Sequence, residues 1–302
     1  MMSSWKGTIH WWNEVWFRPK SPETISLVRI ACGLIAAVHF VLLLTNGGEW
    51  FGPQGWLNVD AGRYLIGDGV EGTGSHFRWS ILYLFPLAVP MVAGIGLLAS
   101  IAMLTGIGAR VSPFLAWICL STFHQRAPLL TLIYEPLLIA ILAYLTIDPG
   151  RLLWTIRPGL ANGQARVSVN IASRLIQCHL WIWIAFSLFS MLASTLWWNG
   201  EAGWLLIQQE NGWLHLSNDW QWLGQLLTHC VIASQLAVLF CMTQSACSWM
   251  GKWMLFFFAL NVLLLLDNWM YASVLLAASL AVWPVHLSRQ NSLPKQNNAS
   301  NK

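Results

Sequence analysis

Residues 111–147 read VSPFLAWICLSTFHQRAPLLTLIYEPLLIAILAYLTI, and this stretch decides what kind of protein the chain can form. Two apolar runs flank the polar segment 121–128, which contains His124 and Arg126. A cation at membrane depth costs about 2.5–3.5 kcal/mol on insertion scales, so it needs a polar partner or a water-filled cavity. The stretch therefore predicts two membrane helices with a buried polar site where they meet.

The composition of the whole chain is typical of polytopic membrane proteins. Hydrophobic residues make up 56% of the 302 residues and charged residues only 9%, whereas about a quarter of the residues in soluble domains are charged. The formal net charge of +4 is spread over the termini and short connections. Nucleic-acid binding needs a clustered basic face, so the expected partner is the lipid bilayer and no nucleic acid.

Apolar runs of about 20 residues are long enough to cross a ~30 Å hydrocarbon core as helices. We expect an all-α integral membrane protein, folded as a single polytopic bundle of about eight transmembrane helices. The number of transmembrane helices is expected to be between six and eight, because three of the apolar runs are short or interrupted. The expected spans are residues 25–45, 80–105, 111–130, 132–147, 170–195, 222–243, 252–267 and 269–287.

One domain is expected over residues 1–287, followed by a disordered cytoplasmic tail over the polar residues 288–302. At the other end, Trp5, Ile9, Trp12 and Trp16 recur at three- and four-residue spacing. This pattern predicts an amphipathic helix over residues 5–17 that lies flat on the membrane, and it does not resemble a cleavable signal peptide.

Most basic residues fall on one side of the eight-span arrangement. Arg110, Arg166 and Lys252 lie in connections that alternate with acidic ones, residues 46–78 and 196–221. The positive-inside rule makes the basic side cytoplasmic, so both termini are expected in the cytoplasm. The expected location is the bacterial cytoplasmic (inner) membrane.

The six cysteines lie mostly inside apolar runs and form no CxxC pair. This arrangement favours buried small hydrophobic side chains over redox or metal chemistry. No metal site is therefore predicted.

Three groups of motifs occur in order over residues 10–285. The first group is Trp16-Phe-Arg-Pro-Lys-Ser-Pro22, Val28-Arg-Ile30, Gly33 and Phe51-Gly-Pro-Gln-Gly-Trp56. The second is the segment 121–128 with Asp148-Pro-Gly150, and the third is Ser173-Arg-Leu-Ile-Gln177 with Trp197-Trp-Asn-Gly-Glu-Ala202. Their succession resembles the HTTM family (the horizontally transferred transmembrane domain), which is related to the membrane part of vitamin K-dependent gamma-carboxylase.

The resemblance implies a helical bundle with a polar cavity open toward the outer side. In the gamma-carboxylases, a lysine near the end of the helix before a Trp-x-x-Gly element acts as the base toward vitamin K hydroquinone. The matching residues 190–194 before Trp197 contain no lysine, and none occurs between Lys20 and Lys252. A desolvated lysine is one of the few groups that can serve as a base at membrane depth. The large extra-membrane domain of those enzymes is missing too, so carboxylase-like lyase chemistry is not expected.

The candidate catalytic residues are His124, Arg126 and Glu135. Arg126 keeps its charge and offers five donors, which suit a carboxylate, a phosphate headgroup or a quinone carbonyl. His124 suits a proton shuttle, and Glu135 is a counter-ion or a general base if it is buried. The structural alternatives are an arginine that snorkels to headgroups and a histidine with purely structural hydrogen bonds.

The candidate ligand-binding residues lie in other parts of the chain and are Arg29, Gln125, Gln177, His179 and Trp197. Arg29 comes about one turn into the first span and is a candidate for an ion pair in the core. Gln177 shares a helix face with Arg174 and is a candidate for a hydrogen bond between helices.

Three functions remain open. The first is a non-carboxylating relative that binds a lipid-like or peptide ligand and assists maturation of a secreted or membrane substrate. The second is a membrane enzyme that oxidises a quinol or modifies a carboxyl group, with a quinone or vitamin K-like molecule as cofactor and Glu135 or His124 as base. The third is a structural subunit of a membrane complex. Haem has no supporting CxxCH motif.

Overall fold

The computed structural model describes residues 2–65, 80–127, 132–150, 165–208, 218–244 and 247–283. Every regular element in these ranges is a helix. The α-helices are α1 (Met2–Phe17), α2 (Glu23–Phe51), α3 (Val59–Leu65), α4 (Ile81–Leu84), α5 (Val89–Thr105), α6 (Val111–Arg126), α7 (Glu135–Ile147), α8 (Val167–Ala193), α9 (Thr195–Trp198), α10 (Glu201–Ile207), α11 (Gln221–Thr243), α12 (Ser248–Leu266) and α13 (Trp269–Val282). The 3-10 helices are η1 (Pro86–Ala88) and η4 (Asn218–Trp220).

Five helical stretches in the described ranges are long and apolar enough to cross a membrane: Glu23–Phe51, Pro86–Thr105, Val167–Ala193, Gln221–Thr243 and Trp249–Leu266. The apolar helices α7 and α13 are shorter. Large apolar side chains remain exposed on the outside of the bundle, among them Leu98 at 69% and Phe186 at 72%. Helices that are apolar on every side face either a core or lipid. The expectation of an all-α membrane protein is therefore confirmed.

Each of the eight expected apolar runs contains a helix, but the second run is interrupted. Proline cannot donate a backbone hydrogen bond and disfavours helix in the residue before it. Accordingly α4 ends before Phe85, and Pro86 opens the 3-10 turn that leads into α5. Three expected features lie outside the described residues: the tail 288–302, the part of the 46–78 loop from residue 66 onward, and Pro128.

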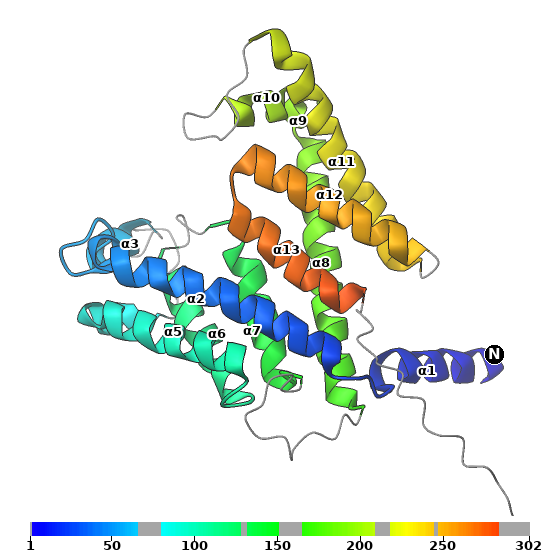
Figure 1. Ribbon diagram of the computed structural model, residues 1–302, viewed down its shortest axis with the longest axis horizontal. Helices are drawn as coiled ribbons and strands as arrows, with labels where there is room; N and C mark the ends of the chain where they lie inside the picture. Colours follow the sequence, from blue (N-terminus) through cyan, green and yellow to red (C-terminus); the bar gives the residue numbers. More distant parts are fainter. Residues whose placement is uncertain are drawn as a thin grey trace, which may run out of the picture.

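The helices form two groups that meet along α13 (Figure 1). In one group α5 packs against α2 and α6, and α6 packs against α7. In the other, α11 packs against α8 and α12, and α12 packs against α13. The groups are joined because α13 contacts both α2 and α8, while α7 contacts α8. Helix α1 lies outside the bundle beside one end of α8.

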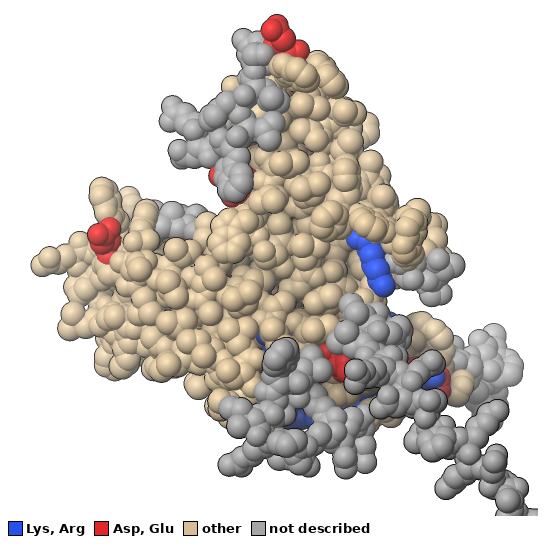
Figure 2. Space-filling view, viewed as in Figure 1, with Lys and Arg blue, Asp and Glu red and all other residues tan. Residues whose placement is uncertain are grey.

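The bundle has two chemically different ends. One end carries Lys20, Arg166 and Arg174, and we call it the basic end. The backbone of Lys20 pairs with that of Arg166, and Arg174 contacts α1. The opposite end holds the last turn of α6 and the first turn of α7, and we call it the Arg126 end. Figure 2 shows Lys and Arg only toward the bottom and right of the view, acidic side chains at the left and top as well as among these cations, and a broad uncharged face between.

Close packing of α2 against α5 depends on a glycine, which gives a direct test of the fold. A Cβ atom at Gly96 would lie 2.4 Å from ring atoms of Phe40, which is fully buried. We expect Gly96→Ala to destabilise the protein by about 1–3 kcal/mol, because the ring has no free volume into which to move. Thermal unfolding in a mild detergent measures this.

The matched control is Gly94→Ala in the same helix, since nothing lies within 4 Å of a Cβ atom there. It should leave the unfolding temperature unchanged or slightly raised, because alanine is the better helix former. Equal unfolding temperatures for the two variants would contradict the packing described for α2 and α5.

Candidate functional site

The end of α6 and the start of α7 bring two ionisable side chains together. Nδ1 of His124 lies 3.5 Å from Oε2 of Glu135. Their side chains are only 20% and 11% exposed, so the contact is largely shielded from solvent. The two form an ion pair when the imidazole is protonated and a neighbouring acid–base pair when it is not. Glu135, a candidate counter-ion or general base from the sequence, therefore contacts the imidazole of His124 directly.

Arg126 joins three segments at this end of the bundle. Its Nη2 donates a hydrogen bond of 3.0 Å to the carbonyl of Leu57, in the turn that follows α2. Its guanidinium carbon lies 4.5 Å from the ring centroid of Tyr83, and the Tyr83 hydroxyl donates to the Arg126 carbonyl. A guanidinium over an aromatic face is attracted by the ring quadrupole.

Burial separates the two interpretations of Arg126. A snorkelling arginine places its guanidinium among water or headgroups, but Arg126 is only 1% exposed. A Cβ atom on Gly62 of α3 would lie 3.1 Å from Nη1 of Arg126, so the backbone of α3 closes over it. The side chain therefore points into the protein.

Two further residues complete the site. Nδ1 of His39, in α2, lies 2.7 Å from the hydroxyl of Tyr134. His39 is 5% exposed and Tyr134 is 1% exposed, and Tyr134 directly precedes Glu135. Nε2 of His39 is buried and has no hydrogen-bond partner within the described ranges. We call His39, His124, Arg126, Tyr134 and Glu135 together the polar cluster.

The sequence contained a signal for His39 that our site prediction did not use. His39 is the only polar residue in the apolar run 34–44, and an ionisable residue within a membrane helix is a functional candidate by default. Tyr134 carries no such signal, because a tyrosine beside an apolar run is equally typical of an interfacial anchor.

The polar cluster has the groups required for proton transfer and for orienting a polar ligand. It pairs a carboxylate with one imidazole and a phenol with another, and both pairs meet at consecutive residues of the chain. Histidine and glutamate can each act as proton donor or acceptor, and buried arginine supplies a permanent positive charge.

An open groove lies at the same end of the bundle, in the turn that follows α2. Its volume is about 390 Å³, and Glu49, Gln54, Gly55 and Trp56 line it. The turn that carries the groove is closed by hydrogen bonds from Trp56 to Glu49 and from Leu57 to Trp50. Because Arg126 holds the Leu57 carbonyl, the arginine also fixes the position of this groove.

The other candidate ligand-binding residues do not all reach the polar cluster. Gln125 is half-buried between His124 and Arg126 on the last turn of α6. Arg29 is 2% exposed, but it lies ten residues before His39, which is about 15 Å along an α-helix. In the described part of the chain Nε of Arg29 has no hydrogen-bond partner and no carboxylate lies within ion-pair distance. The core ion pair expected for Arg29 is thus not found there.

Gln177 and His179 lie in α8 and connect helices. Gln177 donates a hydrogen bond of 2.6 Å to the Ala281 carbonyl of α13 and accepts one of 2.8 Å from Arg174. Nδ1 of His179 lies 3.3 Å from the hydroxyl of Tyr144, and its ring stacks on Trp183.

Trp197 lies in α9, partly buried against the core. Neither it nor the Gln177 and His179 contacts belong to the polar cluster. Within the described residues, no three His, Cys, Asp or Glu side chains are grouped closely enough to hold a metal ion.

Comparisons of this chain with protein-family models, with curated proteins and with solved structures find no match. The geometry of the polar cluster and of the groove is therefore the main indication of what the protein does.

Arg126 provides the first test of this geometry. We expect Arg126→Gln to lower the free energy of unfolding by about 1.5–3 kcal/mol, because the Leu57 carbonyl loses a hydrogen bond from a charged donor. Limited proteolysis should then cut more rapidly within residues 52–58. Thermal unfolding and mass spectrometry of the fragments measure the two effects.

Arg110→Gln is the matched control, since Arg110 is an exposed cation at the other end of α6. It should change neither unfolding nor the cleavage of residues 52–58. An Arg126→Gln protein as stable and as protease-resistant as the Arg110→Gln protein would mean that Arg126 does not hold this turn.

Proposed function

We propose that the chain is an HTTM-like polytopic membrane protein that binds a lipid-like or peptide ligand at the Arg126 end and assists maturation of a secreted or membrane substrate. The observation that carries this proposal is the polar cluster itself, in which α2, α6 and residues 134–135 hold five polar side chains at the same end of the bundle as an open groove. Such a cluster costs free energy in an apolar bundle, so a functional role is the simplest reason for it.

The lining of the groove suits a peptide. Glu49 supplies a carboxylate for an amino group, Gln54 both donates and accepts hydrogen bonds, and Trp56 offers an aromatic face that is 82% exposed. A peptide presents amides, amino groups and apolar side chains, so each group of the groove has a partner. The groove and the polar cluster are linked through the Leu57 carbonyl, which accepts a hydrogen bond from Arg126.

A second function is favoured by the two acid–base pairs. His124 with Glu135 and His39 with Tyr134 can move protons without the lysine that gamma-carboxylases use. A quinol-dependent oxidoreductase or a carboxylase-like enzyme would use a quinone or vitamin K-like molecule here, with Arg126 near its carbonyl oxygen. A structural subunit of a membrane complex is the outcome if no ligand binds.

We also propose that all eight helical runs span the membrane, with both termini in the cytoplasm of a bacterium and the Arg126 end outside its inner membrane. The alternation of the basic and acidic connections supports this orientation. The shorter helices α6, α7 and α13 reach across only if the bilayer thins locally or flanking residues extend them.

Alkaline phosphatase fusions test the orientation, because the enzyme is active only outside the cytoplasm. A fusion after Gln208, at the end of α10, should be active. A fusion after Gly150, at the basic end, should be silent at equal expression. The reverse pattern would invert the topology and place the groove in the cytoplasm.

Ligand retention tests the function. The protein, purified in mild detergent, is analysed by mass spectrometry for co-purified peptides and lipids and by absorbance for quinones. If a quinone is lost during purification, titration with a short-chain naphthoquinone detects the site, and tryptophan fluorescence measures the binding.

We expect the Glu135→Gln variant to bind the retained ligand or the naphthoquinone about tenfold more weakly, or worse, because a hydrogen bond to a charged group contributes about 1.5–3 kcal/mol.

The matched control is Glu201→Gln, an exposed carboxylate in α10 at the same end. It should bind like the wild type. A bound peptide supports the maturation role and a bound quinone supports the enzyme. A wild-type protein that binds neither, or a Glu201→Gln protein that loses as much binding as Glu135→Gln, would refute the polar cluster as a ligand site.

A further inference from the structure

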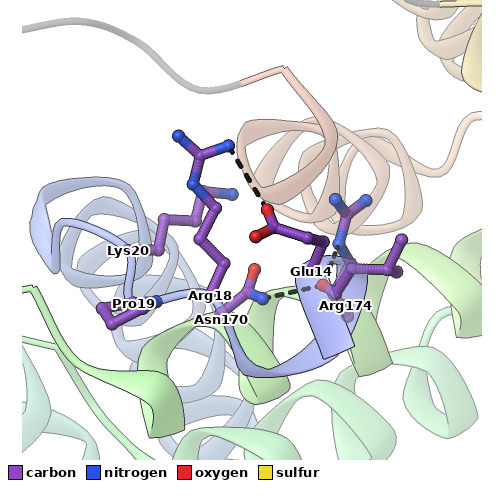
Figure 3. Close-up of a pocket in the computed structure, with 7 residues that line it drawn as sticks. Glu14, Arg18, Pro19, Lys20, Asn170 and Arg174 are labelled. Atoms are coloured by element: carbon purple, nitrogen blue, oxygen red, sulfur yellow. Dashed lines mark hydrogen bonds and ion pairs between the residues drawn. The ribbon is translucent and has the colours of Figure 1, made fainter. Parts of the chain in front are cut away.

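A second concave site lies at the basic end, on the opposite side of the bundle from the polar cluster. Its volume is about 300 Å³, and it lies between the last turn of α1, the turn at residues 18–20 and the first turns of α8 (Figure 3). Its lining includes the three cations Arg18, Lys20 and Arg174 but a single carboxylate, that of Glu14. We call it the basic pocket.

The carboxylate does not neutralise these cations. Oε2 of Glu14 lies 3.9 Å from Nη1 of Arg18, and both side chains are more than half exposed. An exposed pair at this distance contributes little. Arg174 donates only to neutral acceptors in the described part of the chain, the Val15 carbonyl at 3.3 Å and Oε1 of Gln177 at 2.8 Å.

Lys20 is the second cation of the pocket that no carboxylate neutralises in the described part of the chain. Its backbone pairs with Arg166, but the Arg166 side chain is 3.3 Å from the buried carboxylate of Asp148. Within the described ranges no carboxylate lies within ion-pair distance of Lys20. Burial and then the neighbouring charge of Arg174 lower the pKa of the Lys20 ammonium. The two cations therefore repel each other, and an anion between them would relieve the repulsion.

The floor of the basic pocket is rigid. The amide nitrogen of Asn170 donates to the carbonyls of Val15 and Trp16 at 2.8 and 3.0 Å, and Arg174 donates to the Val15 carbonyl as well. These carbonyls end α1 and have no partner within their own helix. Two side chains of α8 thus fix the end of α1 and the wall of the pocket, so little ordering is needed when a ligand binds.

The surroundings of the pocket indicate the depth of a lipid headgroup. Helix α1 exposes large aromatic side chains, with Trp11 at 61%, Trp12 at 51% and Phe17 at 49%. Aromatic side chains on an amphipathic helix place it in the interface between headgroups and acyl chains. The pocket adjoins the last turn of that helix, and therefore opens at the same level.

We propose that the basic pocket binds the phosphate of an anionic glycerophospholipid in the leaflet that contains α1. Lys20 and Arg174 contact the phosphate oxygens, and Arg18 covers the pocket from the side of solvent. A zwitterionic lipid binds less well, because its own cation meets the surplus positive charge of the site. This site is independent of the ligand proposed for the polar cluster.

Native mass spectrometry of the full chain released from mixed vesicles tests the proposal. The vesicles contain phosphatidylglycerol and phosphatidylcholine in equal amounts. We expect one phosphatidylglycerol to be retained in clear preference to phosphatidylcholine. The Lys20→Gln variant should retain about fivefold less phosphatidylglycerol, because one basic residue near an anionic surface contributes about that much to binding. The double variant Lys20→Gln, Arg174→Gln should retain still less.

The Lys20→Gln variant should fold normally, because the substitution leaves the backbone pairing with Arg166 intact. Thermal unfolding of the variant checks this. Lys252→Gln, which removes an exposed cation of α12, is the matched control and should retain lipid like the wild type. Equal retention of both lipids, or equal loss in Lys20→Gln and Lys252→Gln, would overturn the site.

Inorganic phosphate separates the two sources of a phosphate group. The retained phosphatidylglycerol should persist when millimolar phosphate is added, because the acyl chains also contribute to binding. Displacement of the lipid by phosphate at that concentration would mean that the pocket takes a soluble anion, and the lipid assignment would be wrong.

Discussion

The arrangement of the Arg126 end depends on how one buried guanidinium is satisfied. Arginine stays charged in any protein environment, and this one is almost completely enclosed. Arg126 contacts the turn after α2, the ring of Tyr83 and the backbone of α3. The contact with Leu57 also fixes the turn that carries the open groove. A single charge therefore organises segments that are far apart in the chain.

The two ends of the bundle handle charge in opposite ways. At the Arg126 end, carboxylate, imidazole, phenol and guanidinium groups lie within one enclosed cluster, which favours chemistry or oriented binding. At the basic end, Arg166 is paired with Asp148, whereas Lys20 and Arg174 form an open pocket of one sign. Such a pocket favours capture of an anion. The apolar helices between them keep the two sites separate.

Hydropathy predicted the helices well, since an apolar run of about 20 residues has few alternatives to a helix in or near a membrane. It could not predict contacts between distant residues. His39 and Tyr134 are 95 residues apart, and nothing in either run indicates that the two side chains meet. The contact between His124 and Glu135 joins the end of α6 to the start of α7, and composition does not specify that these two ends meet. Arg29 was a candidate for an ion pair, yet the partners of a buried cation depend on packing that sequence periodicity does not reveal.

The attachment of α1 to α8 by Asn170 and Arg174 has a consequence for the surrounding bilayer. A helix in the plane of the interface takes up area only in its own leaflet. The position proposed for α1 would therefore add to the area that the protein occupies in one leaflet. Because the attachment to α8 is made by hydrogen bonds to the backbone of α1, that added area would not depend on the bound lipid.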